Sequence, residues 1–144
     1  MAGGIKQLQE RVAEGGGQGG APTVHVVDDD EAVRDSLSIL LETHGIDVRT
    51  YDSCSSFLSA RPAAANACLV LDLHLPAMSG LDLLDQYPPR QLGMPVILIS
   101  GRMDPQSMAR ALAAGAIAVV EKPFDSQRLL AAIGQAIAST PGTV

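Results

Sequence analysis

The chain has 144 residues, of which 47% are hydrophobic and 18% charged, and its formal net charge is −6. This composition excludes a disordered chain and suits a single folded domain with an aliphatic core, because only 3% of the residues are aromatic. The acidic balance argues against direct nucleic-acid binding, and no apolar run approaches the roughly 20 residues of a membrane span, so we expect a cytoplasmic protein without a membrane partner.

Residues 1–20 differ in character from the rest of the chain. Ile5, Leu8 and Val12 recur at heptad-like spacing, and the segment GGGQGG follows as a flexible linker by composition. We interpret residues 1–20 as a flexible or tag-like N-terminal extension, with a small dimerising helix as the alternative. The folded domain is predicted for residues 21–140, with a tail at 141–144. The sequence contains no helix-turn-helix after the last helix, which leaves open a stand-alone domain or a piece of a longer protein.

The first half of the predicted domain alternates between short apolar runs and amphipathic stretches. Thr23–Val27 (TVHVV) predicts a strand, and Asp30–His44 carries apolar residues at helical spacing. Gly45 suits the C-terminal cap of that helix. Asp47–Tyr51 is the second strand candidate, and Ser53–Ala60 is the second helix candidate.

The same alternation continues through the second half of the domain. Pro88 and Pro89 should end the helix that precedes them, and Asp104 followed by Pro105 is typical of a helix N-terminus. The elements predicted here, in chain order, are Ala67–Leu71, Leu81–Tyr87, Pro95–Ile99, Asp104–Gly115, Ile117–Val120 and a last helix capped by Asp125.

Five strands, each followed by a helix, indicate the α/β fold class. Strands this hydrophobic are typical of a parallel sheet that helices cover on both faces. Right-handed crossovers leave few topologies, and we predict a flavodoxin-like, doubly wound (βα)5 fold with strand order 2-1-3-4-5. In such sheets ligands bind at the carboxyl ends of the strands.

Four of the predicted strands end in polar residues of different kinds. Asp28 and Asp29 follow the first strand, Asp72 the third, Ser100 the fourth and Lys122 the fifth. In the order 2-1-3-4-5 these strands are neighbours, so three carboxylates, a hydroxyl and an ammonium should meet in one crevice. Clustered carboxylates repel unless a cation is bound, and hard oxygen ligands suit Mg²⁺. Asp72 could then act as a nucleophile at phosphorus, with Lys122 and Ser100 contacting the phosphoryl oxygens.

Four segments, VHVVDDDEAVR, LVLDLHLPAMSG, VILISG and VVEKPF, agree in order and spacing with the receiver family of response regulators, which the chain resembles over roughly residues 23–138. The sequence of these segments is most similar to the FixJ-like nitrogen-fixation-regulator subclass, whose members pair a receiver with a helix-turn-helix output domain. The resemblance implies that Asp72 is the phosphoacceptor and that Asp28 and Asp29 are the acidic metal pair, with Asp29 favoured as the direct ligand. The backbone carbonyl of His74 would be a further metal ligand, which leaves its side chain free to vary.

The resemblance also assigns roles near the ends of the fourth and fifth strands. Ser100 matches the switching hydroxyl, Lys122 matches the phosphate-binding lysine, and the peptide bond from Lys122 to Pro123 should be cis, which only an X-Pro bond makes inexpensive. One position departs from the family pattern, because Val119 stands where the family has its switch aromatic. A valine cannot swing between buried and exposed positions as a ring does, so the usual coupling of hydroxyl and ring lacks its ring here.

The function that the resemblance implies is a phosphorylation-dependent signalling switch rather than a turnover enzyme. A sensor histidine kinase would phosphorylate Asp72 in the presence of Mg²⁺. The surface of the fourth helix, fifth strand and fifth helix would then change, giving a homodimer and control of an output, in this subclass transcription. Two alternatives remain open. A haloacid-dehalogenase-type phosphatase would need a second aspartate two residues after Asp72, and a pseudo-receiver would depend on the effect of Val119.

Other polar residues have structural interpretations. Asp30 is predicted as a helix N-cap, with metal ligation as the alternative. His25 is expected to pack in the core and His44 to lie at a helix C-terminus. Cys54 and Cys68 match no metal or redox spacing, so we expect reduced thiols.

Overall fold

The computed structural model describes residues 22–60, 65–102 and 104–138. The extension predicted for residues 1–20 and the tail predicted for residues 141–144 lie outside these ranges.

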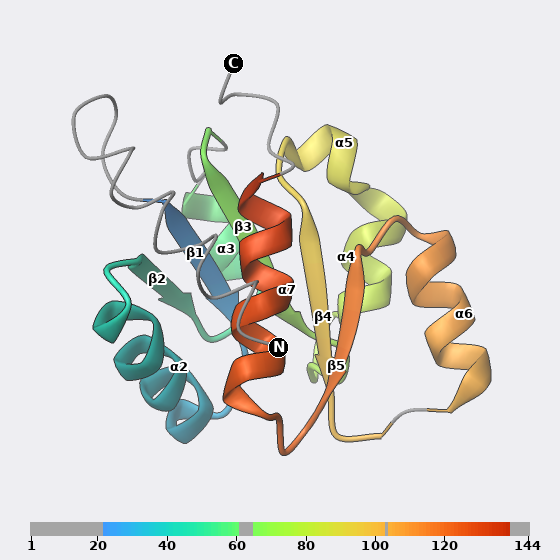
Figure 1. Ribbon diagram of the computed structural model, residues 1–144. Helices are drawn as coiled ribbons and strands as arrows, with labels where there is room; N and C mark the ends of the chain where they lie inside the picture. Colours follow the sequence, from blue (N-terminus) through green and yellow to red (C-terminus); the bar gives the residue numbers. More distant parts are fainter. Residues whose placement is uncertain (1–21, 61–64, 103, 139–144) are drawn as a thin grey trace.

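In the described residues, a parallel sheet of five strands has the predicted order β2-β1-β3-β4-β5 (Figure 1). The strands are β1 (Thr23–Val27), β2 (Asp47–Tyr51), β3 (Ala67–Asp72), β4 (Val96–Ser100) and β5 (Ala118–Glu121). The predictions for β4 and β5 were one residue early at both ends. They stopped at the last apolar residue, whereas Ser100 and Glu121 still pair across the ladder. Ser100, a predicted site residue, therefore belongs to the end of β4.

Helices cover both faces of the sheet, as predicted (Figure 1). The helices are α2 (Glu31–Thr43), α3 (Cys54–Ala60), α4 (Gly80–Gln86), α5 (Pro89–Leu92), α6 (Pro105–Ala113) and α7 (Ser126–Ala138). Helices α2 and α7 contribute to one core cluster, and α3, α4 and α6 contribute to the other. Successive side chains of β3 alternate between the clusters: Cys68 and Val70 lie in the first, and Leu69 and Leu71 in the second. Because both faces are buried, the sequence of this strand is apolar throughout.

Helix α5 was not predicted. Helix α4 does end before Pro88, as expected, but Pro89 then begins a further short helix instead of a plain loop. Proline has no N–H, but at the first helical position this costs no hydrogen bond, because a backbone N–H at that position has no partner within the helix. Gly93, at φ 79°, ends this turn in the left-handed region that glycine adopts without strain.

Local capping interactions fix where the longer helices begin. Asp30 accepts a hydrogen bond from the Ala32 N–H (2.9 Å), and Asp104 accepts one from the Ser107 N–H (2.8 Å). Asp125 similarly accepts from the Gln127 N–H at 2.9 Å. These three interactions confirm the predicted helix starts, since each aspartate satisfies an N–H that the helix leaves unpaired. Within the described ranges, none of the helices is both long and apolar enough to cross a bilayer.

Candidate functional site

The carboxyl edge of the sheet brings together the residues predicted from strand ends. Asp28 directly follows β1, and Asp72 and Ser100 are the last residues of β3 and β4. Lys122 directly follows β5. Because the four strands are parallel neighbours, their ends lie side by side. The predicted meeting of the acidic groups and the ammonium is therefore present, and Ser100 ends the strand next to that of Asp72.

Three carboxylates form a compact cluster at this edge. Asp28, Asp29 and Asp72 each offer one oxygen, and these oxygens all lie within 4.8 Å of one another. Asp28 and Asp72 are buried, whereas Asp29 is exposed and keeps the cluster open to solvent. Burial raises the pKa of Asp28, and the charge of Asp72 adds to this effect, while hydrogen bonds from the Asp30 N–H and Lys122 oppose it. Such a set of oxygens, partly desolvated and mutually repelling, fits a hard divalent cation.

Lys122 lies against two of these carboxylates. Its Nζ is 2.9 Å from Asp28 Oδ2 and 3.2 Å from Asp72 Oδ2. Burial acts to lower the pKa of Lys122, but the hydrogen bond and charge of Asp28 and the charge of Asp72 outweigh it and raise the pKa above its usual value. The peptide bond from Lys122 to Pro123 is cis, as predicted. Lys122 is therefore a charged group held beside the Asp72 carboxylate.

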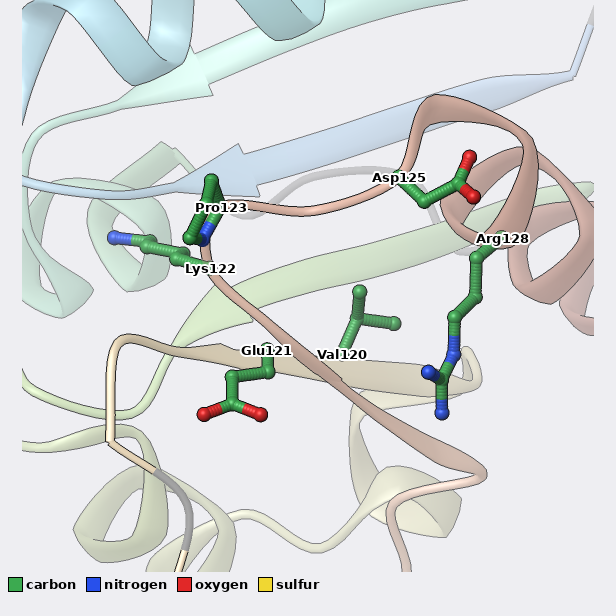
Figure 2. A pocket seen from close by; sticks show the side chains of 6 residues that line it. All are labelled: Val120, Glu121, Lys122, Pro123, Asp125 and Arg128. Atoms are coloured by element: carbon green, nitrogen blue, oxygen red, sulfur yellow. The ribbon is translucent and has the colours of Figure 1, made fainter.

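A hollow beside β5 and the start of α7 shares Lys122 with the acidic cluster. Its lining consists of Val120, Glu121, Lys122, Pro123, Asp125 and Arg128. Figure 2 shows Lys122 and Glu121 leaving the chain in different directions. Lys122 reaches Asp28 and Asp72, whereas Glu121 is exposed. Lys122 thus lines the hollow and also contacts the acidic cluster.

The loop that follows β3 fixes the orientation of Asp72. The His74 N–H donates to Asp72 Oδ1 at 2.9 Å, so this oxygen faces the loop while Oδ2 faces Lys122. The loop then returns towards its start, where the Gly80 N–H donates to the Leu73 carbonyl at 3.1 Å. A Cβ at Gly80 would lie 2.7 Å from the Asp72 carbonyl oxygen. The glycine of LDLHLPAMSG is therefore required for this close approach.

Ser100 is fully buried and its hydroxyl has three neighbours. Its Oγ donates to the Arg102 carbonyl at 2.6 Å and accepts from the Arg102 N–H at 3.1 Å. The third neighbour is Nε2 of His74, also at 3.1 Å. The resemblance leaves the His74 side chain free to vary, and in this chain its imidazole contacts the predicted switching hydroxyl.

Arg34 is a second residue that the sequence analysis missed. Its guanidinium donates to the backbone carbonyl of Asp28 at 2.7 Å and so ties α2 to the acidic loop. One signal was available in the sequence. A cation near a helix N-terminus is unfavourable for the helix dipole, and its presence there suggests a partner outside the helix.

The remaining predictions concern residues around the cluster. Asp30 caps α2 through Ala32 and is absent from the group of three carboxylates, which confirms the cap interpretation. Val119 is half-buried and packs against the core cluster on the α3, α4 and α6 face.

His25 and the two cysteines have the structural roles expected of them. His25 is 4% exposed, and its Nδ1 lies 3.0 Å from the Tyr51 hydroxyl, as a core residue should. Cys54 and Cys68 are buried free thiols. None of these three residues belongs to the acidic cluster.

Comparison with known proteins gives concordant matches. A family model described as response regulator receiver domain matches residues 24–134. Transcriptional regulatory protein FixJ of Bradyrhizobium diazoefficiens is 37% identical over 114 residues, which are 79% of this chain and 56% of the relative. Transcriptional regulatory protein TdiR of Thauera aromatica is 41% identical over 120 residues, or 83% of this chain and 53% of the relative. The chain thus spans little more than half the length of these relatives.

Solved structures agree with the sequence relatives. The crystal structure of FixJ-N superposes with a TM-score of 0.74 at 38% identity, covering 82% of this chain and 94% of that one. The structure of response regulator StyR has a TM-score of 0.76 at 43% identity, with 83% and 60% coverage.

Proposed function

The chain belongs to the response regulator receiver family, and on that premise we propose that it is a phosphorylation-dependent switch of two-component signalling, with Asp72 as the phosphoacceptor. An oxygen of the Asp72 carboxylate attacks the phosphorus of a phosphohistidine on a sensor kinase. A new O–P bond forms, the P–N bond breaks, and its electrons return to the imidazole of the donor. The single observation that carries this proposal is the contact of Lys122 with both Asp28 and Asp72 at one sheet edge.

The acidic cluster is the proposed site of Mg²⁺. Carboxylate oxygens of Asp28, Asp29 and Asp72 and the backbone carbonyl of His74 would hold the ion. The fit rests on the buried Asp28 carboxylate, whose pKa burial raises and whose charge a cation would offset. When bound, the ion supplies positive charge that keeps the carboxylates ionised and offsets the charge of the phosphoryl group.

The chain's own residues supply the remaining functions. The His74 N–H orients the Asp72 carboxylate through Oδ1. The Lys122 ammonium, beside Oδ2, can bind an oxygen of the incoming phosphoryl group. In this proposal Ser100 turns its hydroxyl to another phosphoryl oxygen. Phosphoryl transfer needs little more than this positioning and charge stabilisation.

The proposed output surface consists of α6, β5 and α7, which are the fourth helix, fifth strand and fifth helix of the predicted pattern. Met108, Leu112 and Ile117 are large apolar residues on or beside α6 that are 39%, 50% and 43% exposed. Such a group suits contact with a second copy of the domain. Relatives of this chain are named as transcriptional regulatory proteins, and we extend control of transcription and a cytoplasmic location to this protein as part of the proposal.

Phosphoryl uptake tests the proposal directly. Incubation with Mg²⁺ and acetyl phosphate should add one phosphoryl group by intact mass and shift the protein towards a dimer by light scattering. Asp72→Asn should abolish both effects. The control Asp35→Asn, an exposed aspartate on α2, should respond like the wild type. An Asp72→Asn protein that responds like the wild type would refute Asp72 as the acceptor.

We further propose that the domain is not a turnover enzyme. Haloacid-dehalogenase-type phosphatases use a second aspartate two residues after the nucleophile, and His74 occupies that position. Hydrolysis of an aryl phosphate at about 1 per second or faster, which is within the usual range of enzymes, would contradict this part of the proposal.

A further inference from the structure

The His74 imidazole and the Ser100 hydroxyl meet near the carboxyl ends of the neighbouring strands β3 and β4. Nε2 of His74 lies 3.1 Å from Oγ of Ser100, and the two residues come from different strand ends, 26 positions apart. Ser100 is fully buried, whereas His74 is exposed. A side chain at the surface thus contacts a hydroxyl that solvent does not reach.

The number of hydrogen bonds that the Ser100 hydroxyl can donate and accept determines whether Nε2 of His74 is a donor or an acceptor. A serine hydroxyl has one hydrogen to donate and two lone pairs to accept with. The 2.6 Å contact with the Arg102 carbonyl, which can only accept, uses the hydrogen. The Arg102 N–H donates to one lone pair. His74 must therefore donate from Nε2 to the other lone pair, so the ring carries a hydrogen on Nε2.

We propose that His74 is a positioning residue that holds the Ser100 hydroxyl in this saturated arrangement and so opposes its rotation towards a phosphoryl group on Asp72. This inference rests on the proposed function, because it gives the switching hydroxyl a restraint. A phosphoryl oxygen only accepts, so Ser100 can bind it only after giving up the Arg102 carbonyl. The donor on His74 restrains Oγ against that movement. Removing one such hydrogen bond should shift the rotation equilibrium about fivefold.

Beryllofluoride with Mg²⁺ is a suitable probe, since it mimics the phosphoryl group on a carboxylate. His74→Leu, which removes the donor, should bind beryllofluoride about fivefold more tightly than the wild type by calorimetry. His74→Gln, which restores an N–H donor, should return affinity towards the wild type. In an Ser100→Ala background, His74→Leu should change affinity less than twofold. Equal affinity of His74→Leu and wild type, or an equal effect with and without the Ser100 hydroxyl, would overturn the inference.

The ring of His74 gives a readout that needs no phosphoryl mimic. Nitrogen-15 NMR of the free protein should show hydrogen on Nε2 of His74, and Ser100→Ala should shift that resonance. His44 is an internal control, because its Nδ1 lies 2.9 Å from the Leu40 carbonyl and must carry hydrogen there, independently of Ser100. A neutral His74 ring with hydrogen only on Nδ1 would overturn the restraint. A wild type that shows the expected ring but neither binds beryllofluoride nor takes up phosphoryl would support the restraint and refute the proposed function.

Discussion

Nζ of Lys122 lies 3.2 Å from Oδ2 of Asp72, although 50 positions separate the two residues in the sequence. The same ammonium is 2.9 Å from Asp28 Oδ2, so it already neutralises part of the charge at the proposed cation site. A divalent ion must therefore bind next to a fixed positive charge. This arrangement makes Lys122 favourable for the phosphoryl group and unfavourable for the metal.

Lys122→Met should separate these two effects, because methionine keeps much of the stem and removes the charge. We expect Mg²⁺ to bind on the order of tenfold more tightly, equivalent to about 1.4 kcal/mol, since a repelling charge is gone. Phosphoryl uptake from acetyl phosphate should slow at least tenfold. Calorimetry and intact mass measure the two quantities. Arg128→Met, which removes a cation from the adjoining hollow, is the control, and weaker Mg²⁺ binding by Lys122→Met would contradict the argument.

The ionised carboxylate of Asp28 should lower the free energy of unfolding when no cation is bound. Burial raises the pKa of Asp28 above its unfolded value, so its contribution to stability is present below the unfolded pKa and is lost as the pH rises through the folded pKa. At neutral pH the ionised group opposes folding. Asp28→Asn should therefore increase the free energy of unfolding in Mg²⁺-free urea titrations by about 1 kcal/mol, because Lys122 keeps Asp72 as its ionic partner. Mg²⁺ should stabilise the wild type more than this variant, and a less stable variant without cation would refute the prediction.

Adjacent aspartates should have separable roles. Asp30→Ala removes the cap of α2 and should lower the free energy of unfolding by about 1 kcal/mol, with Mg²⁺ affinity unchanged. Asp29→Ala should weaken Mg²⁺ binding at least tenfold with little change in stability, because Asp29 is exposed and belongs to the carboxylate cluster. Urea titration and calorimetry on both variants test this. Loss of Mg²⁺ affinity in Asp30→Ala would revive that residue as a ligand.

The apolar surface of α6 should be needed for dimerisation and not for phosphorylation. Leu112 is 50% exposed, and Leu112→Glu places a charge in the proposed dimer contact. Phosphoryl uptake should stay within twofold of the wild type, while the dimer observed by light scattering should be lost. Ile39→Glu is the matched control, because Ile39 is 68% exposed on α2. Loss of the dimer in both variants, or in neither, would place the contact elsewhere.

The buried cysteines should resist alkylation over a wide pH range. Burial raises the pKa of Cys54 to about 11 and that of Cys68 to about 12, so neither forms much thiolate below these values. Their contribution to stability is present below the unfolded pKa near 9 and is lost as the pH rises through the folded values. Iodoacetamide at pH 8 should leave both thiols unmodified in the folded protein and modify both in urea. Modification of Cys68 at pH 8 without urea would contradict the burial of this residue.

The sequence by itself determined the strand order and the set of residues at the carboxyl edge. The elements and their polar ends could be predicted because their signals are local in the chain, and the strand order followed because right-handed crossovers leave few topologies. Apolar runs, helix caps such as Asp104, and a polar residue at the end of each strand can be recognised within about ten residues. The chemistry of the strand-end residues already suggested Asp72 as a nucleophile and Lys122 as a phosphoryl contact, and the family resemblance implies the same roles.

Only the tertiary structure decided how these residues contact one another. Two of these contacts join segments that are distant in the sequence: the hydrogen bond between His74 and Ser100, and the contact of Lys122 with both Asp28 and Asp72. A third joins the Arg34 side chain on α2 to the backbone carbonyl of Asp28, outside the helix. Periodicity predicts the direction of a side chain on a strand or helix, but it does not predict where a loop places one. The path of the loop after Asp72 depends on the packing around it, and that packing exists only when the five strands are assembled.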